Sequence, residues 1–316
     1  MKLESQLNES GFLIQGFSEF SQLQTTLFIL FLIIYLIILL GNLSVFAVIS
    51  LTPHLQTPMY IFLMNLSFID ISYSSTTLPK LLHTLYSQNK HISFVGCMTQ
   101  LYFFATFTAT EFMTLTSMGY DRYVAICHPL HYALRMSHRH CMYLISAPWI
   151  IAFVNSTGHT VLISKLSFCA SRLINHFFCD VTPLLKLSCS DTFYVELLTY
   201  ILGTLTTVNS FLLTSVSYIF IISTVLNIHS SEGQQKAFST CTSHVTCVVL
   251  FYGTLICLYM RPTSNYSPSR DKFFALLYIA MIPLLNPIIY TLKNNEFQYA
   301  IKTLSRRVIY FHRIII

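Results

Sequence analysis

The sequence predicts an all-α membrane protein, a bundle of seven transmembrane helices followed by a short C-terminal helix in the membrane interface. Composition is the first reason: the 316 residues are 54% hydrophobic and only 9% charged, whereas charged residues make up about a quarter of a soluble domain. The second is the recurrence of apolar stretches of about 20 residues, the length that crosses hydrocarbon as a helix. Because only short polar gaps separate these stretches, we expect one bundle and not two soluble domains.

Seven apolar stretches follow one another along the chain. The first is the cleanest, since Leu27 to Leu40 is almost uninterrupted, and the second and third are the most polar. The expected spans are 27–50, 58–80, 97–121, 141–163, 195–226, 237–260 and 271–291. They divide the chain into an extracellular N-terminal segment (1–26), a seven-transmembrane domain (27–291) and a cytoplasmic tail (292–316).

The N-terminus is expected outside the cell, in a multi-pass protein of the plasma membrane. Glu4, Glu9 and Glu19 argue against a cleavable secretory signal, so the first span must direct insertion. Lys and Arg do not decide the orientation, because nine of the 18 fall on each side. Asn8-Glu9-Ser10 is a glycosylation acceptor, and it can be used only if the N-terminus reaches the secretory lumen.

The nine cysteines agree with this orientation. Four of them would lie outside, where disulfides persist: Cys97, Cys169, Cys179 and Cys189. Four cysteines allow three connectivities. The other five, at cytoplasmic helix ends or within the sixth span, are expected as free thiols: Cys127, Cys141, Cys241, Cys247 and Cys257.

The tail contains a candidate interfacial helix. Apolar residues recur at spacings of 3 or 4 between Asn294 and about Tyr310, as on one helix face: Phe297, Ala300, Ile301, Leu304 and Val308. The basic residues of the tail suit attraction to anionic membrane lipid, and an ordinary solvated tail explains them equally well: Lys302, Arg306, Arg307 and Arg313. Elsewhere the basic residues are dispersed, so the net charge of +6 does not indicate a nucleic-acid partner.

The segment from Met118 to Cys127, MGYDRYVAIC, ends the third span on the cytoplasmic side. An ion pair there is costly and needs a reason. Arg122 beside Asp121 can be held in a charge pair at rest and then released to a partner's backbone carbonyls; a solvated helix end is the alternative. The segment resembles the signature of rhodopsin-like G-protein-coupled receptors, and its longer form resembles the odorant-receptor version.

Further segments resemble odorant receptors, in order, over the whole membrane region. They are Gly41-Asn42, Leu55 to Tyr60 (LQTPMY), Ser217-Tyr218, Lys236 to His244 (KAFSTCTSH) and Pro283 to Tyr290 (PLLNPIIY). Three departures leave every charge and proline in place: Gln56 stands for the usual His, Gly119 for Ala and Leu284 for Met. Glycine in a helix is expected to loosen it slightly.

The resemblance implies a receptor that binds small, largely apolar volatile molecules in the outer half of the bundle. It also implies activation of a heterotrimeric G protein of the stimulatory, olfactory type, which raises cyclic AMP. A non-olfactory chemosensor with the same mechanism is the alternative. The implied disulfides are Cys97–Cys179 and Cys169–Cys189.

The resemblance implies two sets of site residues. The ligand set is Phe104, Ala105, Thr108, Leu202, Thr206, Tyr252, Leu255, Tyr259 and Ile279. The coupling and switch set is Asp121, Arg122, Tyr123, Tyr218, Lys236, Asn286, Pro287 and Tyr290. None of the ligand set is charged, so we expect a neutral ligand with one hydroxyl or carbonyl, held by Thr or Tyr hydroxyls. Ordinary packing explains any single ligand position nearly as well.

Asp70 and Glu111 are carboxylic acids near the middle of the second and third spans, where acids are rare and usually functional. The resemblance implies that Asp70 helps to hold a sodium ion, with Glu111 as a second acid. A neutral hydrogen-bonded pair is the alternative. Steps of 3 and 4 place Glu111 on one helix face with Phe104, Thr108, Leu115, Met118 and Arg122.

Other functions find little support in the sequence. Enzyme signatures such as Gly-x-Ser-x-Gly, His-Glu-x-x-His and a phosphate-binding glycine loop are absent. Internal repeats, expected of many transporters, are absent as well. His159 and His176 flank the outer cysteines, but the two disulfides use all four thiols, so we expect no metal site and no cofactor other than the sodium ion.

Overall fold

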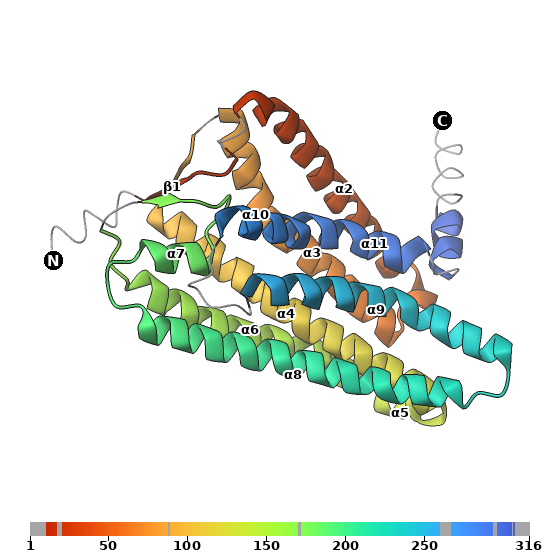
Figure 1. Ribbon diagram of the computed structural model, residues 1–316. Coiled ribbons are helices and arrows are strands. Elements are labelled where there is room, and N and C mark those ends of the chain that lie inside the picture. The colour runs from red at the N-terminus through yellow and green to blue at the C-terminus, as the bar shows by residue number, and fades with distance from the viewer. Residues whose placement is uncertain are drawn as a thin grey trace.

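The computed structural model describes residues 11–17, 21–87, 89–169, 172–259, 267–292, 296–304 and 306. Seven long helical segments run side by side through this part of the chain (Figure 1). Six are single helices: α2 (Gln24–Leu51), α3 (Pro58–Ser87), α4 (Phe94–Cys127), α6 (His138–Ser164), α8 (Phe193–Leu226) and α9 (Ser231–Tyr259). The seventh joins α10 (Pro268–Leu276), the π-helical turn η5 (Leu277–Met281) and α11 (Ile282–Leu292).

The helices match the expected spans in order, and several continue past the apolar stretch. Four described segments are long and apolar enough to cross a membrane: Gln24–Leu51, His138–Ser164, Phe193–Leu226 and Pro268–Ile289. α3, α4 and α9 are more polar, because they carry polar side chains that the bundle encloses. Asp70, Glu111, Asp121 and His244 are all buried.

Helix α4 is the centre of the bundle, where it packs against α3, α6 and α8. It begins at a serine N-cap, since Ser93 Oγ accepts a hydrogen bond from the Gly96 amide at 3.0 Å. The Asn65 side chain then ties three helices together. Its amide donates to Thr114 Oγ1 of α4 at 3.1 Å, and its carbonyl oxygen accepts from Trp149 Nε1 of α6 at 3.0 Å.

Helix α2 is attached to α11 by a second amide. Asn42 Nδ2 donates to Ile38 O and to Pro283 O, both at 3.0 Å. Proline 287 lies inside α11 and faces Gly41, whose missing Cβ would stand 3.4 Å from the proline ring. The Gly41-Asn42 motif and the Asn286-Pro287 motif therefore lie in contact across two helices.

The end of the bundle that carries α7 (Val181–Leu187) also carries both disulfides, and we call it the disulfide end (Figure 1). Cys97 is bonded to Cys179 and Cys169 to Cys189, while the other five cysteines are free. Three short strands pair here in the order β2-β1-β3: β1 (Phe12–Ile14), β2 (His91–Ile92) and β3 (Leu173–Ile174). The sequence-based prediction of an all-α protein did not include these strands.

The opposite end carries Arg122, and we call it the Arg122 end. Short helices η2 (Pro53–Leu55), η3 (Pro129–His131) and α5 (Tyr132–Arg135) connect the long ones here, while η1 (Ser21–Leu23) precedes α2 at the disulfide end. Residues 296–304 form the expected helix of the tail. Phe297 and Ala300 are buried against the bundle, so the apolar face of this helix packs on protein.

Candidate functional site

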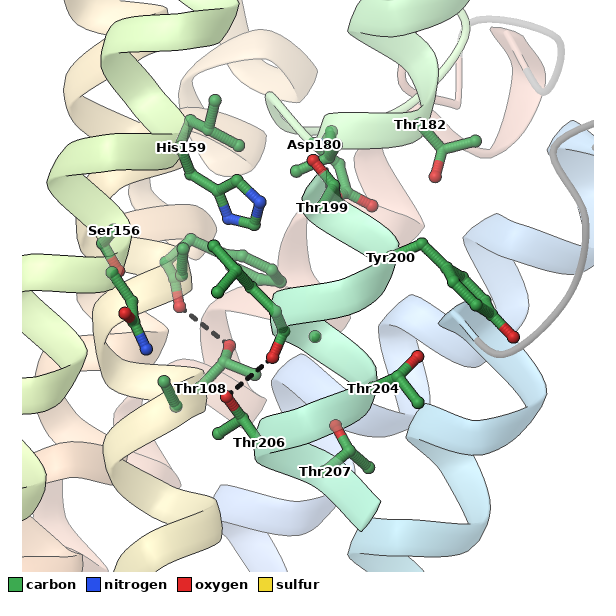
Figure 2. Close-up of a pocket in the computed structure, with 18 of the residues that line it drawn as sticks. Thr108, Ser156, His159, Asp180, Thr182, Thr199, Tyr200, Thr204, Thr206 and Thr207 are labelled. Atoms are coloured by element: carbon green, nitrogen blue, oxygen red, sulfur yellow. Dashed lines mark hydrogen bonds between the residues drawn. The ribbon is translucent and has the colours of Figure 1, made fainter. Parts of the chain in front are cut away.

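A cavity of about 220 Å³ lies between α4, α6 and α8 near the disulfide end, with α7 and one residue of α9 completing its wall. Figure 2 shows Thr108 on α4, Ser156 and His159 on α6, and a series of threonines on α8 around this space. Most of the wall is apolar side chain or hydroxyl. Its shape and chemistry suit a small neutral organic molecule.

Six of the nine predicted ligand residues line this cavity: Phe104, Ala105, Thr108, Leu202, Thr206 and Leu255. Tyr252 and Ile279 are instead buried in the packed core beside the cavity and do not line it. The Tyr252 ring lies 5.2 Å from the Phe112 ring, centroid to centroid, and Ile279 belongs to η5. Both side chains pack in the core in this structure. The Tyr259 side chain lies outside the described residues.

Two cavity hydroxyls already donate to their own helices. Thr108 Oγ1 donates to Phe104 O, and Thr206 Oγ1 donates to Leu202 O, each at 2.8 Å. Thr108 also accepts from the Tyr278 hydroxyl of η5 at 2.8 Å. Each threonine oxygen therefore keeps acceptor capacity that faces the cavity.

Three side chains of the cavity wall are acids or histidines that were not among the predicted ligand residues: His159, Asp180 and Glu196. The two acids are engaged near their own helix starts. Asp180 Oδ1 caps α7 by accepting from the Val181 amide at 2.8 Å, and Glu196 Oε1 accepts from Thr192 Oγ1 at 2.7 Å. Asp180 directly follows Cys179, whose disulfide to Cys97 holds this loop on α4, so the predicted disulfide could have located it.

The loop before α7 is packed by aromatic rings. His176 is buried, with its ring 4.6 Å from those of both Phe177 and Phe178. Burial, together with the nearby charge of Lys272, lowers the pKa of His176 to about 3, so this imidazole stays neutral. Among the described residues, no cluster of three or more His, Cys, Asp or Glu side chains is placed to hold a metal ion.

At the other end of α4, Asp121 and Arg122 form an ion pair, with Nη2 and Oδ2 at 3.0 Å. The second carboxylate oxygen of Asp121 accepts from the Tyr132 hydroxyl of α5 at 2.8 Å. Burial and the Asp121 charge raise the pKa of Tyr132 well above its usual value, so the phenol remains a donor. Asp121 is fully buried.

Comparison with known proteins decides the family. The family model described as "Olfactory receptor" matches residues 31–307, which is most of the chain. The chain belongs to the olfactory receptor family. Human olfactory receptor 8H1 is 47% identical over 301 residues, covering 95% of this chain and 96% of the relative. Chicken olfactory receptor-like protein COR5 is 45% identical over 312 residues, covering 99% and 100%.

The fold of this olfactory receptor is that of rhodopsin. Squid rhodopsin superposes with a TM-score of 0.71 at 20% sequence identity, covering 89% of this chain and 80% of that chain. The family is therefore a receptor family, and the chain shares the rhodopsin fold.

A polar centre of this olfactory receptor contains buried side chains of α3, α4 and α11. Asn286 Nδ2 of α11 donates to both carboxylate oxygens of Asp70 on α3, at 3.2 and 3.0 Å. Glu111 on α4 is also buried, and its Oε1 has no hydrogen-bond partner among the described residues. The predicted stripe continues on either side of Glu111, since Phe104, Leu115 and Met118 are buried.

A second polar link crosses the bundle near Arg122. The Tyr218 hydroxyl of α8 lies 2.6 Å from His244 Nδ1 of α9, and His244 Nε2 lies 3.1 Å from Leu115 O of α4. A carbonyl oxygen can only accept, so Nε2 carries the proton and Tyr218 donates to Nδ1. Tyr123 lies nearby, bonded to His128 Nε2 at 3.0 Å.

Some predicted positions are beyond what the structure describes. The side chains of Lys236 and Tyr290 lie outside the described residues, although their backbones belong to α9 and α11. Asn8 lies outside the described residues altogether. Tyr132 and His244 were not among the predicted switch residues, and their contacts with Asp121 and Tyr218 come from distant parts of the sequence.

Proposed function

We propose that this olfactory receptor binds a small, largely apolar odorant in the cavity between α4, α6 and α8, and that it activates a stimulatory, olfactory-type G protein to raise cyclic AMP. The observation that carries this proposal is the cavity itself. Six residues that the family resemblance assigned to the ligand line it, and it lies in a rhodopsin-like fold. The Asp121–Arg122 pair lies at the far end of the same helix, α4.

The odorant is a neutral molecule with one hydrogen-bonding group, preferably a hydroxyl. The free acceptor capacity of Thr108 and Thr206 suits a donor on the ligand. Asp180 and Glu196 accept hydrogen bonds from neighbouring groups of the protein, and most of the other side chains in the cavity wall are apolar or carry a hydroxyl. Burying a neutral polar group without a hydrogen-bond partner costs roughly 2–7 kcal/mol, and burying an unpaired charge of the ligand would cost more.

Activation is a shift between two arrangements of the bundle. A ligand changes such an equilibrium only as far as its affinity for the two arrangements differs. In the active arrangement, α9 would move outward at the Arg122 end and expose Arg122, Tyr218 and Lys236 to the G protein. Asn286-Pro287 in α11 provides the pivot, because proline removes one rung of the helical hydrogen-bond ladder.

A sodium ion fits the polar centre. Asp70 and Glu111 supply carboxylate oxygens, the ligand type that hard cations prefer, and the unpartnered Glu111 Oε1 is a buried acceptor. The Asn286 amide bonds to both Asp70 oxygens and would orient that carboxylate. When bound, the ion supplies positive charge between two buried acids.

The seven helical segments span the plasma membrane, with the disulfide end outside and the Arg122 end in the cytoplasm. The two disulfides support this orientation, because disulfides persist on the oxidising side. Glycosylation of Asn8 would follow from it. The exposed side chains of Lys302 and Arg306 support a position of the tail helix near anionic lipid of the inner leaflet.

The proposal is tested by measuring cyclic AMP in cells that display the receptor at their surface. We would apply a panel of aliphatic alcohols, aldehydes and ketones and compare the chain with its Arg122→Ala variant, after matching surface levels. A response to a panel member that is lost in Arg122→Ala supports coupling through the Arg122 end. A response of equal size in the variant would contradict it.

A further inference from the structure

A groove on the outer surface of the bundle adjoins the ligand cavity. It has a volume of about 410 Å³, lies between α4, α6 and α8, and shares three lining residues with the cavity: Asn155, Leu202 and Thr206. Ile151 of α6 and Leu205 of α8 line only the groove, and their side chains are 46% and 54% exposed. The groove therefore faces lipid on one side and the cavity on the other.

The groove adjoins the cavity at the place where α6 and α8 both pack on α4. α6 and α8 each pack along α4 but touch each other much less. Thr206 and Leu202 both belong to α8, and Asn155 stands opposite them on α6. These three side chains line both spaces, so the groove and the cavity meet at them.

Two amide side chains mark the groove. Asn155 lies well inside α6, and Asn209, which is exposed, lies near the middle of α8. Neither amide has a hydrogen-bond partner in the part of the chain that the structure describes. An unpartnered amide in hydrocarbon is costly. Any molecule there that carries a hydrogen-bonding group can satisfy these amides, whereas lipid tails cannot.

We propose that this groove is a lateral route by which the odorant passes from the bilayer into the ligand cavity. This inference rests on the proposed function and adds the path by which the odorant reaches the cavity. A lipophilic molecule with one hydroxyl or carbonyl concentrates in hydrocarbon. Asn209 and Asn155 offer it hydrogen bonds as it leaves the lipid, and Thr206 offers the next one at the cavity wall.

The route is tested by cysteine modification, which needs neither an identified odorant nor signalling. Ala105 lines the cavity but not the groove, so an Ala105→Cys variant places a small reporter thiol inside the cavity. The receptor in lipid nanodiscs is treated with one of two thiol reagents. Octyl methanethiosulfonate partitions into the bilayer, whereas sulfonatoethyl methanethiosulfonate stays in water. Mass spectrometry of the peptide that contains position 105 separates this reaction from that of the five native free thiols.

Substitutions that fill or widen the groove should change the rate at which the octyl reagent modifies position 105, and not the rate of the sulfonatoethyl reagent. We expect Ile151→Trp and Leu205→Trp, added to Ala105→Cys, to slow the octyl reagent about tenfold, equivalent to about 1.4 kcal/mol of barrier. Leu205→Ala should speed it. The sulfonatoethyl rate should stay unchanged in all three backgrounds, which also shows that the cavity is still folded.

The possible results distinguish failure of the lateral route from failure of the proposed function. Octyl rates that do not respond to the groove variants would overturn the lateral route while leaving the cavity in place. Failure of the octyl reagent to reach position 105, while the sulfonatoethyl reagent does, would overturn it as well. If neither reagent modifies position 105, the cavity itself, and with it the proposed function, is contradicted.

Discussion

The Asn65 side chain offers a quantitative test of how α4 is held in place. Replacing it by leucine in Asn65→Leu keeps a similar size but removes the bonds to Thr114 and Trp149. Hydrogen bonds between membrane helices contribute about 0.6 kcal/mol on average and up to about 1.7 kcal/mol. The indole N–H of Trp149 would also be left without its acceptor, which costs about 1–3 kcal/mol if it stays buried. We expect a total loss of about 2–4 kcal/mol of unfolding free energy.

The native thiols make this loss measurable. Cys141, Cys241 and Cys247 are free and buried, so a thiol-reactive dye reports their exposure as detergent-solubilised receptor unfolds on heating. A double-mutant cycle with Trp149→Phe isolates the Asn65–Trp149 bond. If the two substitutions are strictly additive, the bond contributes nothing and the reasoning fails.

Three further predictions concern single positions. Gly119→Ala should raise stability by about 1 kcal/mol, because the added methyl meets only ordinary contacts with Thr214 and His244 at 3.6 and 3.7 Å; a lower melting temperature would contradict this. Folding lowers the pKa of His176 from 6.5 to about 3, so the folded protein binds the proton less well than the unfolded chain does. As the pH decreases below 6.5, the free energy of unfolding should therefore decrease by about 1.4 kcal/mol per pH unit. His176→Phe should reduce this loss, measured as melting temperature at pH 7.4 and 5.5, and an equal loss in both proteins would refute the assignment. Thr108→Val removes the acceptor of the Tyr278 hydroxyl and should weaken an alcohol odorant by about 5- to 20-fold in a dose–response assay, equivalent to about 1–2 kcal/mol; unchanged potency would exclude Thr108 as an anchor.

The long helices could be predicted because each feature is local in sequence. Twenty-residue apolar runs fix the spans, and a proline such as Pro58 is favoured in the first turn of a helix. The three short strands escaped prediction because two- and three-residue strands carry no usable alternation. Their pairing depends on Gly11, whose φ of +69° suits glycine.

The family resemblance named several residues that line the cavity, but positions that depend on tertiary packing could not be read from the sequence. Phe104, Thr108 and Thr206 line the cavity as expected, but helical spacing alone could not show that Tyr252 turns into the core. Helical spacing could not place Asp180 either, although the predicted Cys97–Cys179 disulfide could have located it near α4. The groove depends on three helices far apart in sequence, so no local pattern indicates it.

The central claim is that an odorant binds in the cavity beside α4, and one dose–response comparison tests it most directly. Ala105 faces the cavity, whereas Phe103, two residues earlier on the same helix, is 39% exposed on the outer surface and serves as the matched control. Crowding the cavity with Ala105→Leu should cost about 1–3 kcal/mol of binding, which is about 5- to 150-fold in potency. Phe103→Leu should leave potency unchanged. Equal potency of Ala105→Leu and the unaltered receptor, at matched surface expression, would contradict the claim.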